Sequence, residues 1–158
     1  MRGQSLIIDY MAGAFLFLVM FAFFFVIWGI YANMYFSAQA RMELDSTVLS
    51  VSQSLLSSGG EPVNWTADPM AAKRIGLASR QNVLDWARID SLSSLSYAEQ
   101  KIKLGIDRDF VIRIDSAEGA RLATIGNEPN STSRSAEISR FAVLDNKPVR
   151  VRLMAYEA

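Results

Sequence analysis

The chain has 158 residues, in which 16 Lys and Arg are balanced by 16 Asp and Glu, and it contains neither Cys nor His. The lack of these two residue types excludes disulfides, thiolate nucleophiles, zinc sites built from Cys or His, and catalytic triads with an imidazole base. Because the net charge is zero, no overall field would hold the chain on nucleic acid, and we expect no nucleic-acid partner.

The N-terminal part of the chain is an apolar segment long enough to cross a membrane. No charged residue occurs in residues 10–40, and residues 11–32 would measure roughly 33 Å as a helix, which matches the hydrocarbon core of a bilayer. Tyr10 stands at one end, and Tyr31 and Tyr35 stand at the other, where their hydroxyls reach the head-group region. We therefore predict one membrane-spanning helix, with membrane lipid as a partner.

The charges that flank this segment favour a cytoplasmic N-terminus. Arg2 and the α-amino group precede the segment, whereas Arg41, Glu43 and Asp45 follow it and sum to a charge of −1. Positive charge is retained on the cytoplasmic side of a membrane. We expect a single-pass protein of the cell membrane whose remaining residues lie outside the cytoplasm.

A second interpretation is that the apolar segment is removed. The Ala-Gln-Ala at residues 38–40 has the small-x-small pattern of a secretory cleavage site. Ordinary secretory signals have an apolar region of about 7 to 15 residues, and this segment is longer. Release of a secreted domain after Ala40 therefore remains an alternative.

The helical pattern continues beyond the apolar segment. An apolar stripe repeats every three or four residues, which is typical of an amphipathic helix, and it consists of Phe36, Ala40, Leu44, Val48, Val51 and Leu55. The Ser-Ser-Gly-Gly at residues 57–60, followed by Pro62, ends the pattern. We predict one helix from about Leu6 to Ser57 that is transmembrane first and amphipathic second.

The first residues, Arg2-Gly3-Gln4-Ser5, precede an apolar stretch, the acid Asp9 and the long uncharged run. This arrangement resembles the leader and cleavage site of archaeal type IV pilin-like membrane proteins. The segments Gly-Glu-Pro-Val-Asn-Trp at residues 60–65 and Arg-Ile-Gly-Leu-Ala at residues 74–78 are also similar to segments of that family.

The resemblance implies a structural subunit with no cofactor and no enzymatic activity of its own. A prepilin peptidase would cut between Gly3 and Gln4, so that residues 1–3 are a leader, residues 4–57 the helix and residues 58–158 the outer domain. The implied partners are that peptidase, a pilus assembly platform with its ATPase, and like or related pilin subunits that contact the chain through their N-terminal helices. The implied product is a surface filament in which this chain is a minor subunit.

Asp9 has two interpretations. In the family an acid at about the fifth mature position faces the α-amino group of a neighbouring subunit, and Asp9 would be the sixth residue counted from Gln4. A carboxylate and an ammonium group at the edge of the hydrocarbon would offset each other's desolvation. Alternatively, Asp9 flanks the membrane span in the first helical turn, where the helix dipole favours negative charge.

The sequence pattern predicts three short helices at the start of the outer domain. Asp68-Pro69 predicts a helix start, with Gly76 closing the helix. Asp85 predicts a second cap before an apolar face that contains Ile89 and Leu92. The Ser-Tyr-Ala-Glu at residues 96–99 has the spacing of a capping box, and its helix should end near Gly105.

The remaining residues predict an antiparallel sheet of about four strands with one wet face. Alternation starts at residues 110–114, a second strand is expected at residues 121–125, and residues 138–144 and 149–156 flank a turn at residues 145–148. Packed on the amphipathic part of the long helix, this sheet gives a small α+β head, and the whole fold is expected to be type IV pilin-like.

The outer domain offers few candidate sites. Asn64 and Asn130 begin acceptor patterns for N-glycosylation, which matter if the domain is exported. Trp65 and Trp86 favour core packing over a binding groove. The mixture of charges over residues 101–121 predicts a solvated face, and Asp107-x-Asp109 lacks the ligand number of a cation site.

Two further classes of function stay open beside the pilin-like subunit. One is a single-span protein that displays a binding or adhesion domain without assembling into filaments. The other is the secreted domain released after Ala40.

Overall fold

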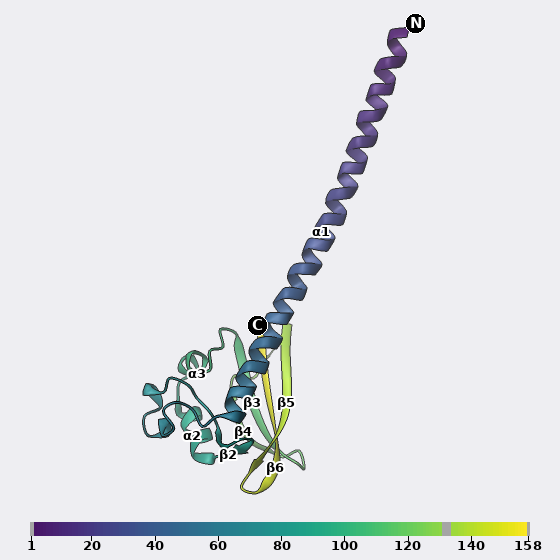
Figure 1. Ribbon diagram of the computed structural model, residues 1–158. Helices are drawn as coiled ribbons and strands as arrows, with labels where there is room; N and C mark the ends of the chain where they lie inside the picture. The colour runs from purple at the N-terminus through teal and green to yellow at the C-terminus, as the bar shows by residue number, and fades with distance from the viewer. Residues whose placement is uncertain (1, 131–133, 158) are drawn as a thin grey trace. The chain divides into compact units, whose positions relative to one another are not determined.

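In the computed structural model, the structure describes residues 2–130 and 134–157, with side chains described from residue 9 onward. The chain forms two compact units, Met1–Ala40 and Arg41–Ala158, which we call the N-terminal unit and the head unit. One helix, α1 (Arg2–Ser57), makes up the described part of the N-terminal unit and continues as the first element of the head unit (Figure 1). The prediction of one long helix that ends at Ser57 is confirmed, but the helix begins at Arg2 rather than near Leu6.

The head unit contains a curled sheet of six strands in the order β1-β2-β5-β6-β3-β4. The strands are β1 (Ala78–Arg80), β2 (Val83–Leu84), β3 (Asp109–Ser116), β4 (Arg121–Gly126), β5 (Arg134–Leu144) and β6 (Lys147–Glu157). The pairing is antiparallel throughout, except that β2 and β5 pair in parallel at Val83 and Val143. The expected mixed α+β fold is confirmed, but the expected four strands are six, because β1 and β2 are too short for alternation to be visible in the sequence.

The core of the head unit lies between the last turns of α1 and the curled sheet, with β3, β5 and β6 drawn around this part of the helix in Figure 1. Leu44, Val48, Val51 and Leu55 are all buried in this core. The helix therefore forms part of the core because its apolar stripe faces a continuous apolar sheet. The predicted stripe is too long at its N-terminal end, since Phe36 is 68% exposed.

The sheet contributes one apolar face to this core. Phe110, Ile112 and Ile114 of β3 belong to it, together with Val151 and Leu153 of β6. Their positions alternate along each strand, so they share one side of the pleat.

One polar link crosses the same space between the sheet and the helix. Arg140 Nε of β5 donates a hydrogen bond of 3.0 Å to Ser52 Oγ of α1. Ser52 is buried, so this bond gives its hydroxyl a partner and ties β5 to the helix.

Two of the three predicted helices form as expected. Helix α2 (Trp86–Ser94) is capped by Asp85, whose Oδ1 accepts a hydrogen bond of 3.0 Å from the backbone N–H of Ala87. Helix α3 (Tyr97–Leu104) begins with the predicted capping box of Ser96 and Glu99 and ends at Gly105, which is left-handed with φ of 67°. These boundaries follow from local hydrogen bonding, which is why the sequence reveals them.

The first predicted helix is wrong in extent. Asp68 does accept a hydrogen bond from the backbone N–H of Ala71, but only two single turns form, η1 (Trp65–Ala67) and η2 (Pro69–Ala71). Gly76 does not close a helix. A Cβ at this position would lie 2.0 Å from the carbonyl oxygen of Ser58, so Gly76 allows two backbone segments to approach each other.

The β5–β6 hairpin confirms the predicted C-terminal pair of strands, with a tighter turn. Asp145 and Asn146 have φ of 50° and 60°, and Leu144 pairs with Lys147 directly. The turn therefore contains two residues rather than four, and positive φ at both positions is typical of a turn that matches the twist of a hairpin.

Candidate functional site

The first candidate site is the exposed apolar surface of α1. Within the described residues, one helix, Asp9–Ser57, is long and apolar enough to cross a membrane, and its apolar window has a mean hydropathy of 2.5. None of that window is buried inside the protein. A core helix of a soluble domain would be mostly buried, whereas a membrane span and a signal sequence are both exposed in this way.

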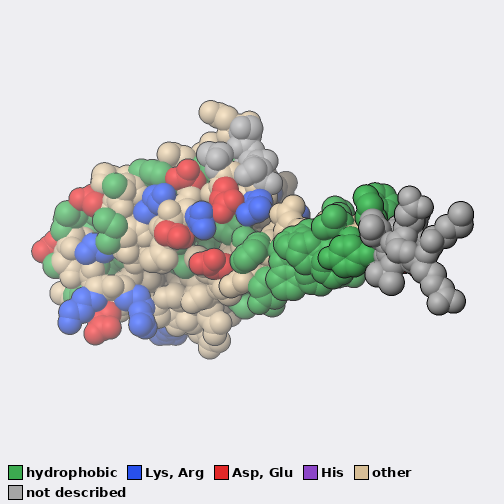
Figure 2. Space-filling model, turned by 90° about the horizontal axis from the view of Figure 1, so that it is seen from above, with side chains coloured by type: hydrophobic (Ala, Val, Ile, Leu, Met, Phe, Trp, Pro, Cys, Tyr) green, Lys and Arg blue, Asp and Glu red, His purple; other side chains and the backbone are tan. Residues whose placement is uncertain are grey.

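Aromatic rings account for much of this surface, and Figure 2 shows apolar side chains over the visible face of the described part of the N-terminal unit. Phe17 and Phe21 stack at 5.8 Å between ring centroids, and Phe21 meets Phe25 edge to face at 4.7 Å. Phe24 stacks on Trp28 at 6.2 Å. These rings lie four residues apart on the helix, so the backbone aligns them into ridges that lipid chains or another helix would cover.

Asp9 is the one acidic residue of the described N-terminal unit, and its side chain is exposed. No residue of 9–130 or 134–157 makes an ion pair or hydrogen bond with its carboxylate. Gly3 and Gln4 belong to the first turns of α1, but their side chains are outside the described ones, as is all of Met1. The proposed cleavage position and the partner of Asp9 therefore stay predictions.

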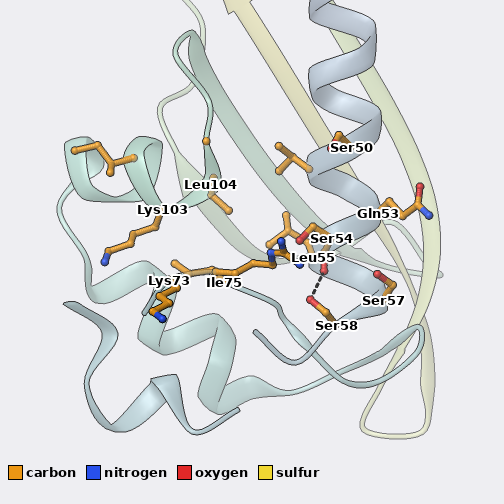
Figure 3. A pocket seen from close by; sticks show the side chains of 14 residues that line it. Ser50, Gln53, Ser54, Leu55, Ser57, Ser58, Lys73, Ile75, Lys103 and Leu104 are labelled. Atoms are coloured by element: carbon orange, nitrogen blue, oxygen red, sulfur yellow. Dashed lines mark hydrogen bonds between the residues drawn. The ribbon is translucent and has the colours of Figure 1, made fainter. Parts of the chain in front are cut away.

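The second candidate site is a cleft of about 490 Å³ in the head unit, shown in Figure 3. One wall is the polar face of α1 with Ser50, Gln53 and Ser54, and the others carry Lys73 and Lys103. Lys103 Nζ donates hydrogen bonds to the carbonyl oxygens of Met70 and Ala72, at 2.5 and 2.7 Å. This ammonium group therefore ties α3 to the η2 segment.

The end of α1 borders the same cleft, and its carbonyl groups have partners. The backbone N–H groups of Leu77 and Asn82 donate to the carbonyl oxygens of Leu55 and Leu56, at 2.9 and 2.8 Å. Cations near a helix C-terminus complement the negative end of its dipole. Lys103 of this cleft thus has a structural role, since its ammonium group is bound by two backbone carbonyl oxygens.

The third candidate site is a cleft of about 430 Å³ at the turns β3–β4 and β5–β6, which we call the tip cleft. Its lining includes Trp86, which is half-buried and packs against the core. Trp65 is fully buried and donates a hydrogen bond of 3.0 Å from its indole to the carbonyl of Gly59. The prediction of core packing is confirmed for Trp65, whereas Trp86 has one side in the core and lines a cleft.

An ion-pair network, centred on Asp115, lies on the face of the sheet opposite the core. This carboxylate is 5% exposed and accepts hydrogen bonds of 2.7 Å from Arg121 and 2.6 Å from Arg152. Burial alone would raise the pKa of Asp115, but the two guanidinium groups hold it below its ordinary value. The prediction of a merely solvated face is therefore wrong here, because the charges pair across three neighbouring strands.

The same network fixes the loop that follows β4. Glu128 forms an ion pair with Arg113, which holds the pKa of Glu128 below its ordinary value. Asn127 contributes through its backbone, since its carbonyl accepts a hydrogen bond of 3.0 Å from the hydroxyl of Tyr156. Figure 2 shows Lys and Arg side chains interspersed with Asp and Glu on the visible face of the head unit.

Asp109 also has protein partners. Its Oδ1 accepts a hydrogen bond of 2.9 Å from the Tyr97 hydroxyl and another of 3.2 Å from Lys101 Nζ. The bond from Tyr97 lowers the pKa of Asp109, and burial raises the pKa of Tyr97 to about 12. Asp107 lies beside Arg108, and the described part of the chain contains no group of three potential His, Cys, Asp or Glu metal ligands.

Asn64 and Asn130, which begin the two glycosylation patterns, are both exposed. Asn64 is exposed just before η1, so its amide is accessible. Asn130 is exposed, but the Ser and Thr that complete its pattern, residues 131 and 132, lie outside the described residues. Modification of either site stays a prediction.

Arg88 is a structural residue that the sequence does not reveal. It is 9% exposed on α2 and donates hydrogen bonds to the carbonyl oxygens of Gly59 and Val63. It thereby supplies partners to a segment that follows α1 and forms no regular structure. Its neighbours in sequence carry no signal of this role, because the accepting carbonyls lie more than twenty residues earlier.

No family model, curated protein or solved structure matches this chain.

Proposed function

We propose that the chain is a pilin-like structural subunit, anchored by α1 in the cell membrane and able to assemble with like subunits through this helix. The proposal rests on the difference in burial between the two parts of α1. Residues of the N-terminal unit expose aromatic and aliphatic side chains, whereas Leu44, Val48, Val51 and Leu55 of the same helix are buried in the core of the head unit. One helix thus joins an exposed apolar surface to the buried core of the head unit.

A physical account of assembly follows from this difference. In lipid, association of helices depends on packing and polar contacts, since acyl chains are as apolar as Leu or Phe. The ridges formed by Phe17, Phe21 and Phe25 offer shape for packing, and Asp9 offers one polar group near the helix start. If cleavage after Gly3 frees an amine at Gln4, pairing of that amine with a neighbour's Asp9 would offset the desolvation of both charges.

The first experiment determines the intact mass and N-terminal residue of the protein extracted from membranes of cells that make it. A chain that begins at Gln4 supports processing by a prepilin peptidase. A chain that begins at Met1 favours a fixed single-span anchor that displays a binding domain. A soluble product that begins at Arg41 would contradict both and favour the secreted domain.

The second experiment replaces Asp9 by Asn. We expect Asp9→Asn to leave membrane insertion intact but to abolish filaments or helix-to-helix crosslinked complexes, because the variant removes the charge without changing the size of the side chain. Asp45→Asn is the matched control, since Asp45 is another exposed acid of α1 but lies in the head unit. Unchanged assembly in Asp9→Asn would refute the role given to Asp9.

A further inference from the structure

The tip cleft lies at one end of the head unit, far from Arg41, the first residue of this unit. Arg41 and Leu44 of α1 line a small hollow together with Arg134 and Ser135, which begin β5. From Ser135 to Leu144 the strand extends by roughly 30 Å at about 3.3 Å per residue. The β5–β6 turn and the tip cleft beside it therefore stand at the opposite end of the sheet from Arg41.

The walls of the tip cleft combine an aromatic and aliphatic surface with charged groups of both signs. Its volume of about 430 Å³ falls within the range of small-molecule sites. The apolar lining includes Trp86, Leu122 and Pro148, and the charged lining is Glu118, Asp145 and Lys147. None of these three charged side chains forms an ion pair with another residue of 9–130 or 134–157.

The cleft is held in place before any ligand binds. Trp86 Nε1 donates a hydrogen bond of 2.8 Å to Asp145 Oδ2, which joins the start of α2 to the β5–β6 turn across 59 residues of sequence. On the other side, the β3–β4 turn is closed by a bond of 2.8 Å from the backbone N–H of Ser116 to the carbonyl of Ala120. The aromatic side chain and the two turns thus have fixed positions, which lowers the entropic cost of binding.

We propose that the tip cleft binds a neutral carbohydrate, one pyranose ring deep, with Trp86 and Leu122 contacting the C–H face of the ring. The charges of the cleft select this class. Lys147 would repel a cation, and Glu118 and Asp145 would repel an anion. A purely apolar group would remove water from these three charged side chains without replacing the hydrogen bonds that the water had made. A ring with hydroxyl groups supplies donors to the carboxylates and acceptors to the ammonium while its C–H face covers apolar side chains.

This inference is independent of the proposed assembly function, since every residue that it uses lies in the head unit. It adds a ligand class to a domain for which the sequence offered only surface recognition of unspecified kind. A site of this size that buries one ring should bind with a dissociation constant on the order of 1 mM.

The test uses the full chain in phospholipid nanodiscs, because detergents with sugar head groups would compete. The indole N–H resonance of Trp86 is followed by NMR during titration with glucose, galactose, mannose and N-acetylglucosamine, each up to about 50 mM. We expect a saturable shift of this resonance with at least one sugar. The indole of Trp65, which is buried and bonded to Gly59, is the internal reference and should not move.

Variants locate the binding. Trp86→Phe assigns the resonance and, like Glu118→Gln and Asp145→Asn, should weaken the affinity about tenfold, as read from sugar resonances by saturation transfer. Asn tolerates the left-handed backbone at residue 145, so that variant preserves the turn. Trp28→Phe, in the N-terminal unit, is the matched aromatic control and should leave the affinity unchanged.

Three results would overturn the proposal. The first is a Trp86 resonance that no sugar of the panel shifts. The second is an equal shift with tetramethylammonium, which would identify a cation site instead. The third is an affinity for sugar that stays unchanged in all three variants, Trp86→Phe, Glu118→Gln and Asp145→Asn. None of these results bears on where the N-terminus is cleaved, so the assembly proposal is judged separately.

Discussion

Replacing Leu55 by Ala tests whether the end of α1 is part of the core of the head unit. Leu55 is 1% exposed, so the change removes three fully buried carbon groups worth about 0.8 kcal/mol each, or about 2.4 kcal/mol in transfer free energy. The cavity that remains adds to this cost, since surrounding side chains relax only in part. We expect the free energy of unfolding of the head unit to fall by about 3 kcal/mol.

Leu49→Ala is the matched control on the same helix. Leu49 is 47% exposed, so roughly half of the transfer term applies, no cavity forms, and the expected loss is about 1 kcal/mol. For a unit of this size, these losses correspond to decreases in Tm of about 12 °C for Leu55→Ala and about 4 °C for Leu49→Ala. Thermal unfolding of the full chain in nanodiscs, followed by the change in tryptophan fluorescence, measures both. Equal decreases would refute the placement of α1 in the core.

Two further predictions concern the sheet and the chain that follows α1. Because guanidinium groups lower the pKa of Asp115, its stabilising contribution is complete above the unfolded pKa of about 3.9 and is lost as the pH falls through the lower folded pKa. Asp115→Asn should therefore cost about 2 kcal/mol at pH 7 and much less at pH 2 in urea unfolding, and an equal cost at both would contradict the ion-pair network. Gly76→Ala should cost at least about 2 kcal/mol, because its Cβ would meet the backbone of Ser58, whereas Gly105→Ala, with open space around it, should cost about 1 kcal/mol from its positive φ alone. Similar losses of Tm in these two glycine variants would show that the close approach at Gly76 is not needed.

The local features of the fold were predictable because they depend on residues close together in the sequence. The Asp85 cap, the capping box of Ser96 and Glu99, and the left-handed end at Gly105 are each decided by hydrogen bonds within one helical turn. The apolar run of α1 is likewise a property of the segment itself. The amphipathic stripe predicted from this pattern wrongly included Phe36, which is exposed. Periodicity along the helix does not show where the sheet that covers it ends.

Other features arise from contacts between distant segments. Strands β1 and β2 are too short to be recognised by alternation, and β2 joins the sheet by pairing Val83 with Val143 of β5. In the sequence Arg88 resembles a surface residue, because the carbonyl groups that it binds belong to a distant segment.

The sequence by itself determined the long apolar helix, the caps of α2 and α3 and the alternation of the long strands, because each follows from propensity and hydrogen bonding within a short stretch of chain. Only the tertiary structure decided that Asp115 is buried between two guanidinium groups and that Trp86 and Asp145 meet across 59 residues to form the tip cleft. Such sites depend on which strands become neighbours when the sheet curls around α1, and that order is selected by burial of the whole core rather than by any single segment.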